Sequence, residues 1–281
     1  MNTSTLETPT ATGRLPAFAQ IAVIGLGYVG LPLSLQFARC GVKVLGLDID
    51  AGKVEALIGG RSYIKHIASE AVAEFSKSGC FSASTDFALV RDVEAVVICV
   101  PTPLSKNREP DISYVLNTGR AIAPHLAKGA LVVLESTTYP GTTDQDLREL
   151  LEAGSGMTAG VDFHLAFSPE REDPGNVDSK VGIVPKVIGG YTPACLERAM
   201  ALYGRAVQSL VPVSSCRVAE ATKLLENIFR SVNIALVNEL KLVYAAMGID
   251  IWEVIQAAKT DRKSTRLNSS HSDLSRMPSS A

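Results

Sequence analysis

The stretch that decides the fold reads Ile21-Ala22-Val23-Ile24-Gly25-Leu26-Gly27-Tyr28-Val29-Gly30. Its apolar first half predicts a strand, and its glycines predict a tight turn that opens a helix. Gly25 would make the turn, Gly27 would let backbone N–H groups approach a pyrophosphate, and Gly30 would allow close packing of helix on strand. The N-terminus of that helix would then face the phosphates with its positive end.

A second predicted strand ends in Asp48, about 20 residues after the glycines, as a dinucleotide-binding fingerprint requires. Asp48 should hold the ribose hydroxyls, which favours NAD over NADP as the cofactor. Lys53 could reach the adenosine ribose or a phosphate, or it could be a solvated residue at a helix start. The alternative for the whole motif is a strand–helix turn without a ligand. The expected cofactor contacts here are Gly25, Leu26, Gly27, Tyr28, Val29, Gly30, Asp48 and Lys53.

Short apolar runs alternate with helical patterns along the first 212 residues. The runs are nearly continuously apolar, as is typical of parallel strands that are covered on both faces. The alternation predicts an α/β fold with a Rossmann-like, doubly wound parallel sheet. We expect strands at 21–25, 43–48, 95–100, 130–135, 164–167 and 186–188, and helices at 31–40, 112–126, 143–153 and 193–204.

The character of the sequence changes after Val213. Residues 219–247 contain neither Pro nor Gly and repeat apolar residues at helical spacing, which predicts one long helix that Gly248 ends. A second helix should begin near Ile251. The serine-rich residues 261–281 cannot bury a core. We therefore expect a disordered lead-in (1–16), an NAD-binding domain (17–212), the start of a central helical, dimerising domain (213–260) and a disordered tail (261–281).

Composition and charge narrow the functional class. The chain has 281 residues, 46% of them hydrophobic, and a formal net charge of -2, which argues against nucleic-acid binding. Its longest apolar runs have the length of strands, far short of a membrane helix, and its N-terminus lacks the features of a secretory signal. The five cysteines and four histidines are scattered, which predicts neither disulfides nor a metal site and favours the cytoplasm.

Two further strand ends carry polar residues. Pro101 and Thr102 follow the predicted strand 95–100, and Thr137 and Thr138 follow the strand 130–135. Ligands of open α/β sheets bind beyond the carboxyl ends of the strands, so these loops should line the nicotinamide side of the site. The alternative for the two later threonines is capping of the next helix.

Catalytic candidates come from a loop and from the long helix. Pro169 and Pro174 constrain a charged loop in which Glu170 is the best general base, while Arg171 could pair with a carboxylate of the fold or with a substrate phosphate. The alternative is a charged surface turn. Lys223 and Asn227 share one face of the helix and could stabilise an oxyanion, or they could form a solvated stripe.

Seven ordered motifs between about Ala19 and Thr260 resemble the UDP-glucose/GDP-mannose dehydrogenase family. Within it, they are most similar to the branch of bacterial UDP-N-acetyl-D-glucosamine 6-dehydrogenases. The motifs read IAVIGLGYVGLPL, VICVPTPL, REPDISYV, LVVLESTTYPGTT, AFSPEREDPGN, IVPKVIGG and AEATKLLENIFRSVNIALVNELK. The resemblance implies a twofold oxidation of a sugar C6 alcohol to a carboxylate with NAD, through a cysteine-bound thioester.

The resemblance also implies residue roles. Glu170 matches the glutamate that serves thioester hydrolysis, and Lys223 with Asn227 matches the oxyanion-stabilising, substrate-binding pair. Thr137 matches a threonine that holds an active-site water and also falls, with Thr102, in the NAD site. UDP-glucose enzymes commonly carry a second glutamate where Pro174 stands, which favours a UDP-N-acetylhexosamine as substrate and leaves its epimer open.

The resemblance implies, finally, that family members continue beyond the second helix. They carry a glycine-rich loop with the nucleophilic cysteine and then a UDP-binding domain, and they form homodimers through the long helix. We therefore expect this chain to be a truncated, inactive fragment with a foreign-looking tail. The alternatives are a non-catalytic NAD-binding dimerisation module and a single-step dehydrogenase. For the latter, His125 and His164 are poorly placed as a base.

Overall fold

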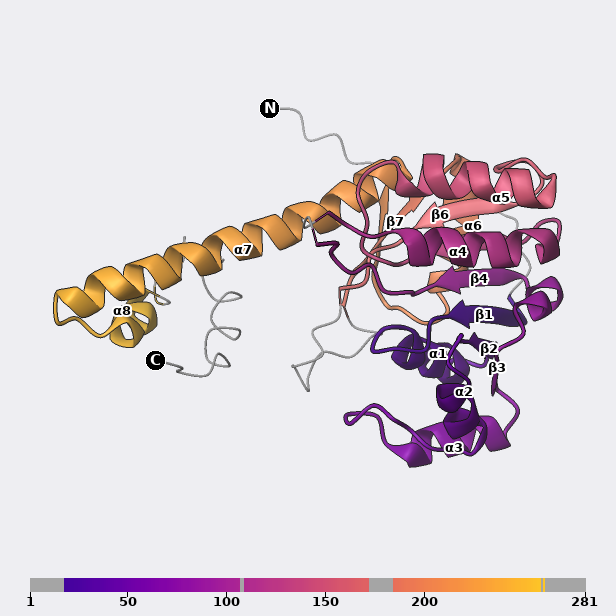
Figure 1. The fold of residues 1–281 in the computed structure, drawn as a ribbon, viewed down its shortest axis with the longest axis horizontal. Coiled ribbons are helices and arrows are strands. Elements are labelled where there is room, and N and C mark those ends of the chain that lie inside the picture. The colour runs from indigo at the N-terminus through magenta and orange to yellow at the C-terminus, as the bar shows by residue number, and fades with distance from the viewer. Residues whose placement is uncertain (1–17, 107–108, 172–183, 259, 261–281) are drawn as a thin grey trace. The chain divides into compact units, whose positions relative to one another are not determined.

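The computed structural model describes residues 18–106, 109–171, 184–258 and 260, in two compact units that divide after Glu220. The first unit is built on an eight-stranded sheet with the strand order β3-β2-β1-β4-β5-β6-β7-β8 (Figure 1). The strands are β1 (Gln20–Ile24), β2 (Lys43–Leu47), β3 (Phe81–Ser84), β4 (Ala95–Ile98), β5 (Leu131–Leu134), β6 (His164–Phe167), β7 (Lys186–Gly190) and β8 (Leu210–Val213). The order reverses between β1 and β4, which is where a doubly wound sheet binds its ligand.

Six of the seven strand pairings are parallel, and the exception lies between β6 and β7. There Ala166 pairs with Gly190 and Phe167 with Gly189 in antiparallel register. The predicted Rossmann-like α/β class is confirmed, and the sheet is mostly parallel, with β7 and β8 running against the other six strands. The reversal brings the first residue of β7 to the carboxyl ends of β5 and β6.

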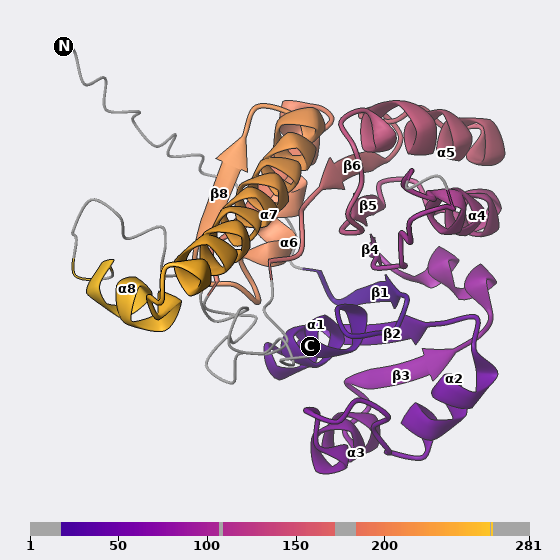
Figure 2. The ribbon, with the colours of Figure 1, turned by 60° about the vertical axis from the view of Figure 1, so that its left-hand side comes forward.

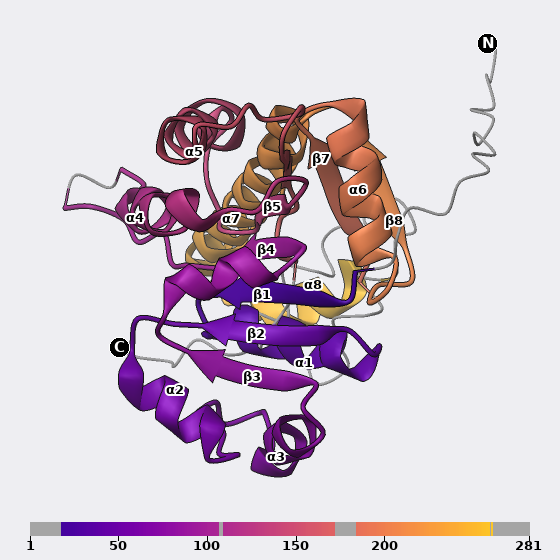
Figure 3. The ribbon, with the colours of Figure 1, turned by 90° about the vertical axis from the view of Figure 1, so that its right-hand side faces the viewer.

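Helices cover both faces of the sheet, as the continuously apolar strands require. The helical segments of this unit are α1 (Gly30–Arg39), α2 (Ala51–Ile58), α3 (Ser69–Lys77), η1 (Phe87–Asp92), α4 (Ser113–Ile122), η2 (Ala123–His125), η3 (Thr142–Leu147), α5 (Arg148–Ser155) and α6 (Pro193–Tyr203). Figures 2 and 3 show α4 and α5 on one side of the strands and α1 and α6 on the other.

Successive residues of each central strand enter different cores. Ile21 and Val23 of β1 pack with α1 and α6, whereas Ala22 and Ile24 pack with α4 and α5. All four side chains are 0–1% exposed. Burial on both faces explains why these strands lack a polar alternation.

The second unit begins within α7 (Cys216–Ala246), the long helix that the sequence predicts at 219–247. Gly248, with φ of 71°, follows it, and α8 (Ile251–Ala258) begins where a second helix is expected. Val237, Ile251 and Ile255 form its small core. The predicted domain boundary after residue 212 stays a prediction.

Several elements have no counterpart in the sequence prediction: α3, η1, β3 and β8. For α2, the sequence suggested only a helix start near Lys53. The helix predicted at 143–153 begins as the π-helix η3 and continues as α5. The predicted lead-in 1–16 and tail 261–281 lie outside the described residues. Among the described helices, none combines the length and apolar character needed to cross a membrane.

Candidate dinucleotide and active site

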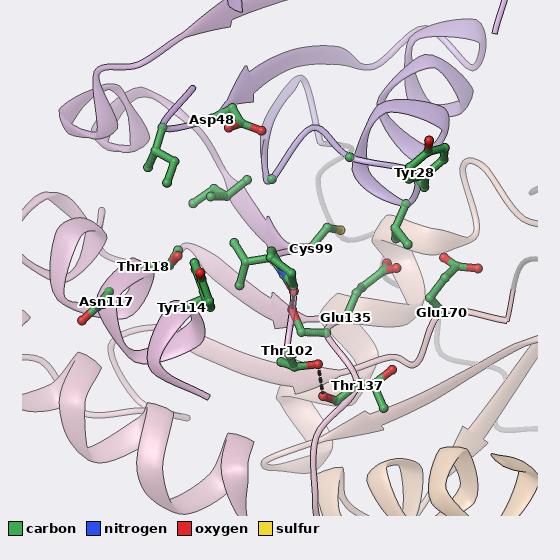
Figure 4. Close-up of a pocket in the computed structure, with 18 of the residues that line it drawn as sticks. Tyr28, Asp48, Cys99, Thr102, Tyr114, Asn117, Thr118, Glu135, Thr137 and Glu170 are labelled. Carbon is green, nitrogen blue, oxygen red and sulfur yellow. Dashed lines mark hydrogen bonds between the residues drawn. The ribbon is translucent and has the colours of Figure 1, made fainter. Parts of the chain in front are cut away.

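A cleft of about 830 Å³ opens in the first unit at the carboxyl ends of β1, β2, β4 and β5 (Figure 4). Nine of the predicted cofactor residues line it, together with the predicted base: Gly25, Gly27, Tyr28, Val29, Asp48, Lys53, Pro101, Thr102, Thr137 and Glu170. These predicted residues therefore line one continuous cleft, and their roles in binding stay predictions. Its position over the reversal in strand order is the expected one for a dinucleotide.

The glycine turn is closed on the protein side and open on the cleft side. A Cβ on Gly25, whose φ is 88°, would lie 2.7 Å from the carbonyl oxygen of Cys99, and a Cβ on Gly30 would lie 2.0 Å from the oxygen of Gly25. A Cβ on Gly27, by contrast, would meet nothing within 4 Å. Leu26 is fully buried beneath the turn. Gly27 thus leaves room for a ligand beside the start of α1, which has no side-chain cap.

Asp48 connects the turn to the next loop. Its Oδ2 accepts a hydrogen bond from the backbone N–H of Leu26 at 2.9 Å, and its Oδ1 accepts one from Asp50 at 3.0 Å. The ammonium of Lys53 lies 3.5 Å from the same carboxylate, and its side chain is 37% exposed. Lys53 therefore occupies the first turn of α2 and also lines the cleft, so both interpretations of this residue fit in part.

Hydrogen bonds join the two loops on the other side of the turn. The hydroxyl of Thr102 donates to the carbonyl of Thr137 at 2.7 Å, and the hydroxyl of Ser136 donates to Val100 at 2.6 Å. The next helical segment is held at its start by another group: the carboxylate of Glu220 accepts hydrogen bonds from the backbone N–H groups of Gly141 and Thr143. Thr137 is thus free of the capping role that the sequence left open, and it faces the cleft.

A buried ionic cluster lies at the far end of the cleft from Asp48. The Nζ of Lys186 is 3.0 Å from Oε2 of Glu135 and 4.0 Å from Oε2 of Glu170. The Tyr203 hydroxyl donates to the other oxygen of Glu135. Figure 4 shows the two glutamates at this end of the cleft. Burial raises the pKa of Glu135 although the Lys186 ammonium opposes it.

Sequence reasoning did not find this cluster. The sequence prediction placed Glu135 at the end of one strand and Lys186 at the start of another, with no contact between them. Ile24, Ile49, Phe87, Cys99, Val100, Tyr114, Asn117, Thr118, Ala121 and Ser136 also line the cleft without having been predicted. The one available signal was the charge of Glu135 directly after four buried apolar residues.

The remaining candidates are placed as follows. Glu170 accepts a hydrogen bond from the backbone of Arg171, whose Nη1 donates to the carbonyl of Pro185 at 3.0 Å. Lys223 and Asn227 are half-buried on α7 in the second unit, so their catalytic role stays a prediction. Pro174, which favoured the N-acetylhexosamine branch, lies outside the described residues.

The cysteines do not form disulfides, and three of them are buried: Cys99, Cys195 and Cys216. Cys216 donates to the carbonyl of Gly189, and burial raises the pKa of its thiol, which keeps it protonated. Among the residues that the structure describes, no group of three His, Cys, Asp or Glu side chains could hold a metal ion.

Residues 19–207 match the family model described as the UDP-glucose/GDP-mannose dehydrogenase family, NAD binding domain, and residues 217–272 match the central domain of the same family. The chain belongs to the UDP-glucose/GDP-mannose dehydrogenase family. Its cofactor is NAD, and the cleft fits it: Gly27 leaves the phosphate side open, and Asp48 stands at the end of β2 for the ribose.

Relatives within the family carry two sugar names. The chain is 40% identical over 248 residues to the UDP-N-acetyl-D-mannosamine dehydrogenase of Escherichia coli K12 and 36% identical over 242 residues to the UDP-N-acetyl-D-glucosamine 6-dehydrogenase of Pseudomonas aeruginosa. Each alignment covers 86% of this chain but only 59% and 56% of the relative. The chain thus spans less than three fifths of the length of these relatives.

Solved structures of the family agree. The UDP-D-ManNAc dehydrogenase of Pyrococcus horikoshii superposes with a TM-score of 0.82 at 36% identity, covering 86% of this chain and 58% of that one. A UDP-glucose dehydrogenase of Pyrobaculum islandicum gives a TM-score of 0.80 at 28% identity, covering 91% and 59%. These matches confirm the predicted family and fold.

Proposed function

We propose that this chain supplies the NAD-binding half of a nucleotide-sugar dehydrogenase that oxidises the C6 alcohol of a UDP-N-acetylhexosamine to the carboxylate. The observation that carries the proposal is one cleft with a dinucleotide-binding turn at one end and two carboxylates, Glu135 and Glu170, at the other. A dinucleotide held at Gly27 and Asp48 must extend its second half over the ends of β4 and β5, toward these carboxylates.

Bound NAD would accept hydride from the sugar; the residues of this chain bind, orient and move protons. Asp48 is placed to accept hydrogen bonds from ribose hydroxyls, and the loops of Thr102 and Thr137 enclose the second half of the cofactor. Glu170, 15% exposed at the cleft, can take a proton from water in the hydrolytic step. Lys223 and Asn227 would stabilise the oxyanion, and Arg171 would bind a substrate phosphate.

The sugar is a UDP-N-acetylhexosamine in this proposal. The sequence favoured UDP-N-acetylglucosamine, with UDP-N-acetylmannosamine as the alternative and UDP-glucose less favoured. The 40% identical relatives are named for the mannosamine epimer and a 36% identical one for the glucosamine epimer. Both sugars therefore belong in the assay.

We also propose a cytoplasmic homodimer that pairs through α7 and serves surface polysaccharide synthesis.

The test assays the protein at the full length of its relatives with NAD and each UDP-sugar. Two NADH per sugar are expected from UDP-N-acetylglucosamine or its mannosamine epimer, because an alcohol becomes a carboxylate. One NADH per sugar, or a strong preference for UDP-glucose, contradicts the proposal. The 281-residue chain should bind NAD without sustained NADH production, because Cys40 and Cys80 do not line the cleft, and Cys99, which does, is only 9% exposed. Sustained turnover would overturn that part.

A further inference from the structure

Lys186 reaches the active site because β7 runs against β6. Continuing the antiparallel register in which Phe167 pairs with Gly189 places Lys186 opposite Glu170, three residues beyond the last bonded pair. Glu135 directly follows β5, which is parallel to β6. A parallel β7 would have put its first residue at the opposite edge of the sheet. The reversed strand therefore delivers one cation between two carboxylates that follow neighbouring strands.

The three groups differ in their access to the cleft. The side chains of Glu135 and Lys186 are 0% and 8% exposed, and their charged atoms lie 3.0 Å apart. Glu170 is 15% exposed and lies 4.0 Å from the same ammonium. The inner carboxylate is held by a second contact, the Tyr203 hydroxyl, whose ring also lies 4.9 Å from the ammonium. Both carboxylates line the cleft, and Glu170 is the more accessible of the two.

A general base at the position of Glu170, beside a buried ammonium, must change its charge during the reaction. When Glu170 takes a proton, an ammonium paired only with it would be left buried and unpaired, which is strongly unfavourable. Lys186 avoids this state because Glu135 remains beside it. Burial alone would lower the pKa of Lys186, but the two carboxylates outweigh it and raise the pKa, so the ammonium persists.

We propose that Glu135 is the permanent counter-ion of Lys186, and that this pair is a positioning device which holds the Glu170 carboxylate toward the cleft while letting it gain and lose a proton. The proposal rests on the proposed role of Glu170 as the base. Glu135 and Lys186 are positioning residues, because they act on the substrate through Glu170. Four groups face the ammonium: Glu135 directly after β5, Glu170 from the loop after β6, Tyr203 from α6 and Cys99 directly after β4.

Thermal unfolding of the 281-residue chain distinguishes the role of Glu135 from that of Glu170. Glu135→Gln should lower Tm by about 10 °C, because the buried ammonium loses its close partner. Glu170→Gln should change Tm by less than about 2 °C, and Glu135→Gln with Lys186→Met should be more stable than Glu135→Gln alone. Lys128→Met is the matched control, since Lys128 pairs with Asp162 at the same 3.0 Å but is 79% exposed. Equal losses for Glu135→Gln and Glu170→Gln would overturn the proposal.

A merely structural ion pair would not respond to Glu170, so a second measurement follows the Glu135 carboxyl by ¹³C NMR during a pH titration. Removing the neighbouring charge in Glu170→Gln should lower the midpoint for Glu135 by roughly one pH unit, and Lys186→Met should raise it. An unchanged midpoint in Glu170→Gln would show that the ammonium is not shared. The NMR titration needs folded protein and no substrate. The positioning role of Glu135 and Lys186 can therefore fail while the proposed sugar oxidation stands, and the proposed sugar oxidation can fail while the positioning role stands.

Discussion

The ammonium of Lys186 lies 3.0 Å from the carboxylate of Glu135, and both side chains are buried at the edge of the sheet where the NAD cleft opens. Such a pair contributes little net stability compared with apolar residues, but its partners depend strongly on each other. Its position beside Glu170 therefore indicates a role in the site rather than in folding alone. The Tyr203 hydroxyl completes this ionic cluster. Its raised pKa should make the free energy of unfolding depend on pH in alkaline solution.

Tyr203→Phe should flatten the loss of stability at high pH. Burial, and then the charge of Glu135, raise the pKa of Tyr203 well above the usual 10.0. The unfolded chain loses this proton near its ordinary pKa while the folded chain keeps it. The free energy of unfolding must therefore fall as pH rises above that value, by up to about 1.4 kcal/mol per pH unit.

Urea unfolding between about pH 9 and about pH 11 measures this slope. In Tyr203→Phe, the slope of the free energy of unfolding against pH should lose most of the contribution of one proton. Tyr114→Phe, at an exposed tyrosine, should keep the wild-type slope. Equal slopes in all three proteins would contradict the assignment. Lys186 contributes with the same sign and remains in both variants.

Gly25→Ala should destabilise the fold by more than its backbone conformation alone explains. Its φ is 88°, and the added methyl would lie 2.7 Å from the oxygen of Cys99. Gly129→Ala is the matched control, with φ of 82° and no atom within 4 Å. We expect a loss of about 1 kcal/mol for the control and roughly 2 kcal/mol more for Gly25→Ala, by chemical denaturation. Equal losses of stability in Gly25→Ala and Gly129→Ala would show that the turn can shift to accommodate the added methyl group.

Asp48→Asn should weaken NAD binding by roughly tenfold to a hundredfold, because a charged acceptor for the ribose hydroxyls is lost. The same change should reduce discrimination against NADP, whose additional phosphate the carboxylate repels. Calorimetric titration of wild type, Asp48→Asn and Asp92→Asn compares a cleft residue with an exposed aspartate. An unaltered affinity in Asp48→Asn would remove this residue from the site.

Glu220→Gln should loosen the start of the helical segment after β5. The carboxylate accepts hydrogen bonds from the backbone N–H groups of Gly141 and Thr143 and from the Thr143 hydroxyl. A neutral amide cannot accept all three, and the bonds are buried, so we expect a loss of about 1–3 kcal/mol in the free energy of unfolding. Hydrogen exchange at Gly141 and Thr143 should rise in the variant. Unchanged exchange would mean that other groups hold this start.

The central strands and the glycine turn were predictable because their signals are local. Four apolar residues ending in Gly25 and a second run ending in Asp48 leave few alternatives for the chain. The edge strands were not predictable: Phe81–Ser84 is half polar, and Leu210–Val213 contains Pro212, which a sheet tolerates only at its edge. Because the edge strands are less buried than the central strands, their sequences show a weaker apolar pattern.

The direction of β7 could not be read from the sequence, and the contact between Glu135 and Lys186 was missed for that reason. A strand buried on both faces has the same apolar pattern whichever way it runs, so Lys186–Gly190 does not reveal its orientation. Glu170 and Thr137 could be placed at the cleft because they follow strands whose direction was predicted. The contact between Glu135 and Lys186 depends on the pairing of β6 with β7, which only the structure supplies.

The central claim, that this chain holds NAD in the cleft beyond β1, β4 and β5, is tested most directly by titrating the purified chain with NAD and with NADP in a calorimeter. We expect one NAD per chain and an affinity for NADP lower by about tenfold or more. We also expect Gly27→Val to abolish NAD binding without lowering Tm, because a Cβ there meets only the open cleft. Absence of NAD binding to the folded chain, or equal binding of both dinucleotides, would contradict it.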